Sequence, residues 1–317
     1  MTTPTHSRMH LETGQIAERV RHALATPLPD LPPAPQALYT LARGSSDHAA
    51  TVVHRLLAAA GMPATTMPPS LLGERLRLGG AALLAISQSG ASPDLCSAAE
   101  RARACGSAVV AIVNTSGSPL AGAATTTLPQ HAGEERAVAA TKSVICSIVA
   151  GARLAERWGA PPLGLDTLPE EISEVQRWPF GTLASLFADD GPLLVIGRGS
   201  GLGVAAEIAL KVQELLGRPA MAYSSAEVLH GPAGMVTAGY PVLALAHGPE
   251  RESVASSVER LRELGAAVSV LDASPRDDAL AATVALAHVY LALESACRAR
   301  GRSPDKPDNL DKVTLTH

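Results

Sequence analysis

The sequence predicts an α/β protein with two tandem domains, each built on a doubly wound parallel sheet. Short, unbroken apolar runs alternate along the chain with longer stretches of helical periodicity, which is the pattern of buried parallel strands and their crossover helices. The two halves of the chain also resemble each other at a nearly constant spacing. Finally, 317 residues are enough for two domains of about 150 residues with separate cores.

The predicted elements follow from these apolar runs in chain order. In the first half, residues 81–86 and 109–113 are predicted strands, and residues 141–158 are a predicted helix. The second half predicts strands at 193–196, 242–246 and 268–271, and a helix over about 203–216. In doubly wound sheets ligands collect at the carboxyl ends of the strands, so we expect functional residues in the loops that follow them.

Two copies of one α/β unit account for the resemblance between the halves. A strand runs into an Arg-Gly-Ser turn at Gly44 and again at Gly199, which is 199 − 44, or 155, positions later. A later strand follows Gly106 and again Gly265, which is 265 − 106, or 159, positions later. Two such similar offsets indicate a duplication. The copies differ chemically, because the second has a single imidazole, His247, where the first has a cluster of hydroxyls.

The predicted domain boundaries place the first domain at residues 38–165 and the second, with a C-terminal tail, at residues 180–317. The boundary falls between residues 158 and 179 because glycine, proline and acidic residues interrupt the apolar periodicity there. Residues 1–37 are predicted to form an N-terminal helix and a lead-in. A proline-rich segment, residues 27–35, makes this lead-in stiff.

Composition and charge argue against several classes of partner. Hydrophobic residues make up 46% of the chain, aromatic residues only 3%, and the formal net charge is −4. Lysines and arginines are dispersed without a basic stripe or an aromatic stacking motif, so nucleic acid is not expected as a partner. No apolar run reaches the roughly 18 residues of a membrane span, and the first 15 residues lack a secretion signal. A cytoplasmic location is therefore expected.

The four cysteines, Cys96, Cys105, Cys146 and Cys297, show no Cys-x-x-Cys spacing and no nearby histidine pair. Metal sites and disulfides are consequently disfavoured, and reduced core cysteines are expected. The sequence gives no reason to expect a metal or an organic cofactor.

A polar loop follows the apolar run that ends at Ile86. Ser87, Gln88, Ser89 and Ser92 stand where a helix would begin, and a helix start presents unpaired N–H groups and a positive dipole end. These side chains can therefore surround an oxyanion such as a phosphate without a lysine. An ordinary N-cap followed by a polar turn is the alternative for this segment taken alone.

A charged stripe runs along the predicted helix of the second half. Glu207, Lys211 and Glu214 are spaced by four and three residues, so they share one face of a regular helix. The apolar residues that face the core are Val204, Ile208, Val212 and Leu215. The stripe is either a solvated surface or part of a site.

Two further cations stand beside predicted turns. His230 directly precedes Gly231-Pro232, and a histidine held on a turn can face a cleft. Lys312 lies close to the C-terminus, where lysines are commonly mobile solubilising groups. The residues around it are less typical of a mobile tail. Pro307, Asn309 and Leu310 suggest a fixed turn, and residues 313–315 read as an ordered extension that carries Lys312 back into the protein.

Six motifs, in order, resemble those of the sugar isomerase (SIS) domain pair in the isomerase half of glucosamine-6-phosphate synthase. The resemblance extends from about residue 38 to the end of the chain and implies two flavodoxin-like domains. The motifs lie at residues 42–46, 86–92, 138–142, 209–214, 229–232 and 305–312.

The resemblance also implies a role for each candidate residue. Glu214 matches the proton-transferring glutamate of the family, His230 its ring-opening histidine and Lys312 its near-terminal lysine, while Lys211 is an electrostatic neighbour in the substrate site. The backbone near Val138 touches the sugar. The phosphate-binding residues are Ser45, Ser46, Ser87, Gln88, Ser89 and Ser92. The chain departs from the family at Ser45 and Ser92, which replace threonines, and at Asp308 and Asp311, which replace a basic and a small residue.

The expected reaction follows from a further difference between this sequence and the synthases. The synthases release ammonia from glutamine with an N-terminal cysteine nucleophile, whereas this sequence begins Met1-Thr2-Thr3 and its first cysteine is Cys96. It therefore resembles the type II glucosamine-6-phosphate deaminases, which implies conversion of glucosamine 6-phosphate to fructose 6-phosphate and ammonia. A homodimer is also expected, since the family completes its site near a subunit interface.

Several other functions are compatible with the same residues. A galactosamine-6-phosphate deaminase, a fructosamine-6-phosphate deglycase and an aldose-ketose sugar phosphate isomerase would use the same base and phosphate loops. A non-catalytic sugar-phosphate sensor is the alternative from another class. The sensor gives no reason for Glu214, His230 and Lys312 to occur together.

Overall fold

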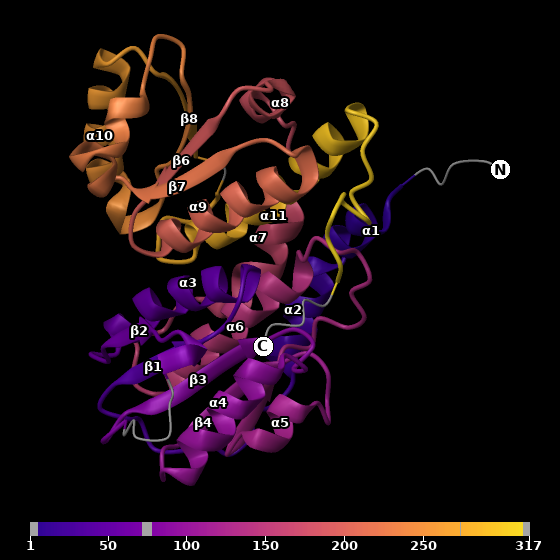
Figure 1. Cartoon of the computed structure of the whole chain (residues 1–317), viewed down its shortest axis with the longest axis vertical. Helices are drawn as coiled ribbons and strands as arrows, with labels where there is room; N and C mark the ends of the chain where they lie inside the picture. Colours follow the sequence, from indigo (N-terminus) through magenta and orange to yellow (C-terminus); the bar gives the residue numbers. More distant parts are fainter. Residues whose placement is uncertain (1–5, 72–77, 273, 313–317) are drawn as a thin grey trace, which may run out of the picture. The chain divides into compact units, whose positions relative to one another are not determined.

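The computed structural model describes residues 6–71, 78–272 and 274–312, which form two compact units, each around one parallel sheet (Figure 1). The first-sheet unit consists of residues 18–135 and 142–166. The second-sheet unit consists of residues 6–17, 136–141 and 167–312. The α/β architecture with two parallel sheets confirms the predicted fold class.

The first-sheet unit contains five parallel strands in the order β2-β1-β3-β4-β5. Its strands are β1 (Leu38–Leu41), β2 (Ala64–Thr66), β3 (Ala82–Ser87), β4 (Val109–Val113) and β5 (Thr126–Pro129). Its helices are the larger part of α2 (Ile16–Ala25), then α3 (Ser45–Ala59), η1 (Pro69–Leu71), α4 (Pro93–Ala104), α5 (Pro119–Ala123), α6 (Lys142–Arg157) and the start of η2 (Leu165–Thr167). The predicted strands at 81–86 and 109–113 and the predicted helix at 141–158 thus lie within one residue of β3, β4 and α6.

The core of this unit explains why its central strands are apolar throughout. Every residue of β3 and β4 is buried, as expected of strands that have helices on both faces. Alternate residues of these strands pack against α4 and α5. Helices α3 and α6 pack closely together elsewhere in the unit, since a Cβ atom at Gly151 would lie 2.3 Å from a methyl group of Val53.

The second-sheet unit contains four parallel strands in the order β7-β6-β8-β9. Its strands are β6 (Leu193–Gly197), β7 (Ala220–Ser224), β8 (Pro241–Leu245) and β9 (Ala267–Leu271). Its longer helices are α1 (Arg8–Gly14), α7 (Leu168–Val175), α8 (Thr182–Ala188), α9 (Ser200–Lys211), α10 (Arg251–Glu263) and α11 (Ala281–Ala299). Short turns of helix lie at η3 (Val212–Leu216), η4 (Glu227–His230), η5 (Pro232–Met235) and η6 (Gly248–Glu250). The three predicted strands of this half are β6, β8 and β9.

The duplication is visible in the backbone as well as in the strand order. Gly44 and Gly199 are the N-cap residues of α3 and α9, with φ and ψ of 51° and −131° in the first and 57° and −127° in the second. A positive φ of this kind favours glycine. Both sheets also reverse their strand order at the same place, between β1 and β3 and between β6 and β8. In doubly wound folds this reversal marks the position of ligand sites.

The units do not divide the chain at a single position. Residues 6–17 and 136–141 belong to the second-sheet unit although they precede the predicted boundary. The predicted linker contains α7 instead of an irregular segment. Its acidic residues, Glu170 and Glu171, lie in the first turn of the helix, where negative charge is stabilising. The predicted ordered extension at residues 313–315 lies outside the described residues.

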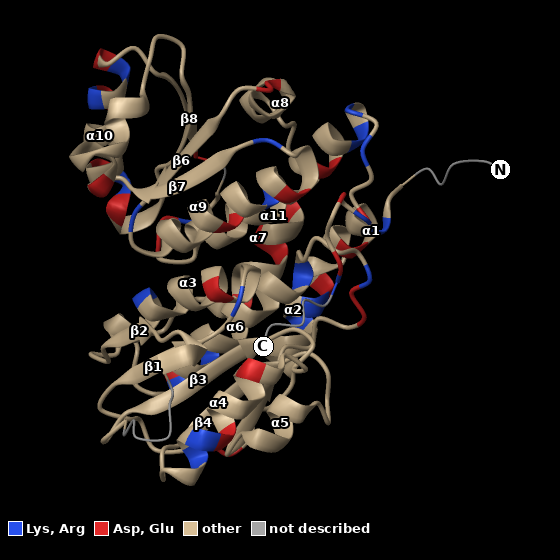
Figure 2. Ribbon diagram, viewed as in Figure 1, with Lys and Arg blue, Asp and Glu red and all other residues tan. Residues whose placement is uncertain are grey.

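The distribution of charged and apolar residues in the structure relates to the predictions about nucleic acid, membranes and metals. Acidic and basic residues are interspersed along the helices of both units (Figure 2). Within residues 6–71, 78–272 and 274–312, no helix is long and apolar enough to cross a bilayer. The same residues contain no group of three or more His, Cys, Asp or Glu side chains that could hold a metal ion. The cytoplasmic location and the homodimer stay predictions.

Candidate active site

The two loops at the strand reversal of the first sheet carry the predicted phosphate-binding hydroxyls. Leu41 of β1 is the register partner of Ala85 of β3, so the loops that follow both strands leave the same edge of the sheet. Ser45 and Ser46 form the first turn of α3 and are half-buried. An ion pair joins the two loops, because the Arg43 guanidinium lies 2.7 Å from the Asp94 carboxylate at the start of α4.

The loop after β3 is a tight turn that is closed by hydrogen bonds to its own serine hydroxyls. The Ser87 hydroxyl accepts a hydrogen bond from the Gly90 N–H at 3.1 Å, and the Ser89 hydroxyl accepts one from the Ala91 N–H at 3.3 Å. Gly90 has a φ of 62°, and a Cβ atom there would lie 2.2 Å from the Ser118 hydroxyl oxygen. No other residue fits this position without a shift of its neighbours.

Ser92 occupies the N-cap position of α4, as the alternative interpretation of this segment requires. Its hydroxyl makes no capping hydrogen bond, however. The half-buried side chains of Gln88, Ser89 and Ser92 therefore remain candidates for an oxyanion at this helix start.

The charged stripe of the second-sheet unit is buried. The side chains of Glu207 and Lys211 are each 1% exposed, and that of Glu214 is 19% exposed. The Lys211 ammonium lies 3.4 Å from a Glu207 carboxylate oxygen and 2.6 Å from a Glu214 carboxylate oxygen. A solvated surface is thus the wrong interpretation for Glu207 and Lys211. We call Glu207, Lys211 and Glu214 the charge triad.

The two carboxylates keep Lys211 protonated. Burial alone would lower the pKa of Lys211, but the charges of Glu207 and Glu214 and their hydrogen bonds outweigh it, so its pKa is raised. A buried ammonium between two carboxylates is a source of fixed positive charge beside Glu214.

The turn that carries Glu214 is wider than the sequence predicted. The α-helix begins at Ser200 instead of about residue 203 and ends at Lys211, and residues 212–216 form a π-helical turn. Gly217 ends this turn in the left-handed conformation, and Arg302 donates a hydrogen bond to the Leu215 carbonyl at 2.9 Å. Isolated π turns occur frequently at functional sites.

Lys312 lies at the loop that precedes α6. Its ammonium donates a hydrogen bond to the Ala137 carbonyl at 2.7 Å. The adjacent Val138 N–H donates to the Asp305 carbonyl at 3.0 Å. The structure thus brings together the predicted sugar-contacting backbone and the predicted C-terminal lysine within the second-sheet unit.

A family model described as SIS domain matches residues 34–157 and 186–291. The chain belongs to the SIS domain family. The two matched segments contain β1 to β5 and β6 to β9, respectively, so each parallel sheet corresponds to one SIS domain.

Curated relatives of this SIS chain include two enzymes named glutamine–fructose-6-phosphate aminotransferase [isomerizing]. The protein of Corynebacterium diphtheriae is 33% identical over 220 residues, which are 63% of this chain and 35% of the relative. The protein of Methanothermobacter thermautotrophicus is 32% identical over 249 residues, which are 72% of this chain and 42% of the relative. The chain thus spans less than half the length of these relatives.

Solved structures match the chain over nearly its full length. A protein of Silicibacter pomeroyi DSS-3, for which phosphosugar isomerase activity has been suggested, is 32% identical with a TM-score of 0.85, covering 95% of this chain and 100% of that chain. A glucosamine-6-phosphate deaminase of Thermotoga maritima is 20% identical with a TM-score of 0.82, covering 98% of this chain and 100% of that chain. At this lower identity the second likeness shows the fold alone.

His230 is the predicted residue that the structure does not join to the others. It ends the short helical turn η4 after β7, and its side chain is exposed. Among the described residues it makes no hydrogen bond or ion pair with the charge triad. Its role as the ring-opening residue stays a prediction.

Two acidic side chains support the SIS loop 136–141, Glu12 directly and Asp305 through α1, and the sequence did not reveal these contacts. The Glu12 carboxylate of α1 accepts hydrogen bonds from the N–H groups of Arg136 at 2.6 Å and Ala137 at 3.2 Å. The Asp305 carboxylate accepts from the first N–H groups of α1, those of Arg8 at 3.0 Å and Met9 at 2.8 Å. Helix α1 therefore supports the loop 136–141, to which Lys312 donates its hydrogen bond.

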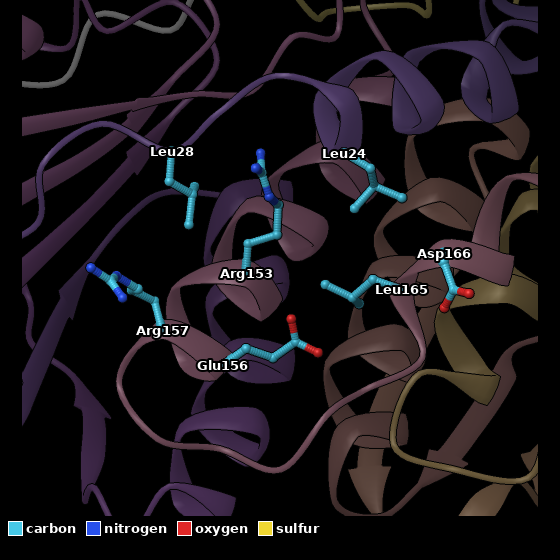
Figure 3. Close-up of a pocket in the computed structure, with 7 residues that line it drawn as sticks. All are labelled: Leu24, Leu28, Arg153, Glu156, Arg157, Leu165 and Asp166. Carbon is cyan, nitrogen blue, oxygen red and sulfur yellow. The ribbon is translucent and has the colours of Figure 1, made fainter.

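A separate pocket of about 500 Å³ lies in the first-sheet unit, where the close-up labels three leucines, two arginines and two acidic residues (Figure 3). Arg153 donates to the carbonyls of Ala23 at 2.5 Å and Thr26 at 2.6 Å, and Glu156 accepts from the Leu163 N–H at 2.6 Å. Both charged groups thus fix the chain around the pocket, and none of the predicted site residues lines it.

Proposed function

We propose that this SIS protein is an amino sugar phosphate deaminase that also acts as an isomerase, converting glucosamine 6-phosphate and water to fructose 6-phosphate and ammonia. The observation that carries the proposal is the charge triad. Burying these charges costs desolvation free energy that apolar residues at the same positions would avoid, which supports a role beyond packing.

Glu214 is the base in this proposal because it is the carboxylate of the triad that solvent reaches. The Glu207 side chain is 1% exposed, whereas the Glu214 side chain is 19% exposed. The Lys211 ammonium lies 2.6 Å from the Glu214 carboxylate and holds it in place. A carboxylate held in this way can accept a proton from a substrate carbon.

The loops of the first sheet bind the phosphate in this proposal. Their hydroxyls suit a dianion, and the positive dipole ends of α3 and α4 favour it. Phosphate binding is remote from the reacting carbons, so its binding energy can be used to hold the substrate for the reaction, which makes proton transfer effectively intramolecular.

The proposed reaction then proceeds in three steps. His230 moves a proton between the ring oxygen and the C1 hydroxyl, which opens the ring to the aldehyde. Glu214 takes the C2 proton while Lys312 stabilises the developing charge on the C1 oxygen, which is protonated as the enolamine forms. Return of the C2 proton to C1, with loss of one N–H proton to solvent, gives a 2-imino sugar phosphate. Addition of water to this imine and loss of ammonia give fructose 6-phosphate.

The relatives agree with one end of this reaction. Two of them are named for fructose 6-phosphate and for isomerisation, and a third carries the suggestion of phosphosugar isomerase activity. We therefore take fructose 6-phosphate as the product. The choice of glucosamine 6-phosphate as substrate comes from the sequence motifs.

An assay of ammonia and ketose formation tests the proposal. The substrates are glucosamine, galactosamine, fructosamine, glucose and fructose 6-phosphates, with N-acetylglucosamine 6-phosphate as the control that has no free amine. We expect ammonia and fructose 6-phosphate in equal amounts from glucosamine 6-phosphate. Interconversion of glucose and fructose 6-phosphates without any ammonia would replace the proposal with a simple isomerase, and binding without turnover would replace it with a sensor.

The variant Glu214→Gln tests the assignment of the base. It keeps the size of the side chain and removes the proton acceptor, so kcat is expected to fall by about 10³-fold. Glu227→Gln is the matched control, because Glu227 is an exposed glutamate of the same unit and is expected to be neutral. Full turnover by Glu214→Gln would remove Glu214 from the mechanism.

A further inference from the structure

Tyr290 is a fully buried tyrosine whose hydroxyl reaches the charge triad. It lies on α11 with 0% exposure and is the largest of the fully buried side chains in the described part of the chain. Its hydroxyl donates a hydrogen bond to Glu207 Oε1 at 3.1 Å. A buried tyrosine hydroxyl needs a partner, and here the partner is a charged group.

Four polar groups therefore form one connected series inside the second-sheet unit. The hydroxyl of Tyr290 contacts Glu207, whose carboxylate lies 3.4 Å from the Lys211 ammonium. The Lys211 ammonium lies 2.6 Å from Glu214 at the other end of the series. The first three members are buried, and solvent reaches only the fourth.

The distances show that Lys211 is shared unequally by its two carboxylates. Glu207 and Glu214 are chemically identical, so the closer approach to Glu214 needs a cause. The hydrogen bond from Tyr290 neutralises part of the Glu207 charge and weakens its attraction for Lys211. Glu214 accepts from no hydroxyl among the described residues and keeps the shorter ion pair.

We propose that Tyr290 is a positioning residue: through Glu207, it directs the Lys211 ammonium toward Glu214 and thereby keeps the proposed base oriented. This inference rests on the proposed function of Glu214. The titratable groups that face Lys211 are Glu207 from α9 and Glu214 from the π-helical turn, and α11 contributes Tyr290 behind Glu207. Tyr290 itself does not touch the substrate.

The variant Tyr290→Phe removes the hydroxyl and keeps the ring. Glu207 then competes more strongly for Lys211, and Glu214 loses part of its ion pair. We expect kcat to fall by about tenfold, which is the scale of one hydrogen bond to a charged group, with KM changed less than about twofold. Because the base must be deprotonated, the acid limb of kcat/KM moves to higher pH.

Tyr240→Phe is the matched control in the same unit. Tyr240 is partly exposed and lies outside the charge triad. Its variant is expected to keep the wild-type kcat, KM and acid limb. A Tyr290→Phe protein that loses thermal stability but keeps the wild-type acid limb would show a merely structural tyrosine and would overturn the inference.

A second substitution keeps the inference testable if Tyr290→Phe fails to fold. Replacement of Tyr290 by 3-fluorotyrosine preserves the packing and makes the hydroxyl a stronger donor. The acid limb of kcat/KM should then move to lower pH, opposite to the change expected for Tyr290→Phe. A shift in the same direction as that of Tyr290→Phe, or none, would contradict the inference.

A measurement without turnover separates this inference from the proposed function. The carboxyl ¹³C resonance of Glu214, assigned by its loss in Glu214→Gln, is titrated in the wild type and in Tyr290→Phe. The resonance is expected to titrate at higher pH in the variant. If this shift occurs although no amino sugar is turned over, the positioning role holds and the function fails. If ammonia is released but the titration is unchanged, the function holds and the positioning role fails.

Discussion

Each SIS domain has a helix at the equivalent point in its fold, α3 in the first domain and α9 in the second. Buried charged residues lie on α9 at positions where α3 has apolar residues. Helices α3 and α9 begin after equivalent glycines 155 positions apart (199 − 44). At this offset, Glu207 and Lys211 correspond to Val52 and Leu56, which are apolar and buried. The fold therefore needs only apolar residues at these positions, so the buried charges of α9 serve something other than the architecture.

In the loops that follow β3 and β8, it is the first domain that carries the additional polar groups. The first domain has several hydroxyls after β3, whereas the second has His247 in their place. His247 is 6% exposed, and neither of its ring nitrogens has a hydrogen-bond partner among the described residues. One copy thus keeps features of an anion site and the other keeps a buried charge triad. In the proposed function, phosphate binding and proton transfer are therefore divided between the two copies.

The largest effect on activity is expected when the charge triad is replaced by the residues at the equivalent positions of α3. The triple variant Glu207→Val, Lys211→Leu and Glu214→Ala should lose at least about 10³-fold in kcat. Its stability should stay the same or rise by about 1–4 kcal/mol, because well-packed apolar residues avoid the desolvation of buried ions. Ammonia release and urea unfolding measure the two quantities. A large loss of stability would show that the charges support the fold, which would break the comparison.

Removal of one member of the triad should be worse for stability than removal of all three. Lys211→Leu leaves two uncompensated carboxylates and is expected to lower the free energy of unfolding by about 3–5 kcal/mol. The raised pKa of Lys211 means that the wild type keeps its contribution below the ordinary value of 10.5 and loses it only as the pH rises through the folded value. The deficit should therefore persist from about pH 6 to 9. Urea titrations across this range test it, and a variant as stable as the wild type would contradict it.

His247 should make the second SIS domain sensitive to acid. Burial lowers its pKa from 6.5 to about 4. The folded protein thus binds its proton less readily than the unfolded chain, so stability is complete above pH 6.5 and falls as the pH decreases toward 4. The loss is about 3 kcal/mol at full protonation. His247→Gln should reduce this loss when unfolding is measured between these pH values, whereas His22→Gln, at an exposed histidine of the other unit, should not.

The smallest effect concerns the equivalent serines at the starts of the two helices. Ser45→Ala in α3 should raise KM for the sugar phosphate by about tenfold with little change in kcat, because it removes binding shared by substrate and transition state. Ser200→Ala in α9 is the matched control and should leave KM within about twofold. Equal effects of the two substitutions would show that the domains do not differ in phosphate binding. Steady-state kinetics decide between these outcomes.

Much of the fold could be predicted because its signals are local. The apolar runs predicted β3, β4, β6, β8 and β9 to within one residue, since a strand buried on both faces needs apolar residues throughout. The polar loop after β3 was also predicted, because the apolar run of this strand ends abruptly in polar residues. The π-helical turn at residues 212–216 was missed, because its residues have the periodicity of an ordinary helix and its end is fixed by Arg302 from a distant segment.

The site divides in the same way. The sequence alone determined the strands β3, β4, β6, β8 and β9, the duplication, the family motifs and the identity of Glu214, Lys211 and Lys312 as candidates, because each depends on a pattern within a short segment. Only the tertiary structure decided that Lys211 is buried, that Glu12 holds the Lys312 loop and that Tyr290 reaches Glu207. The last two pairings join residues 124 and 83 positions apart. Contacts of this kind arise from the packing of whole elements, and no periodicity along the chain encodes them.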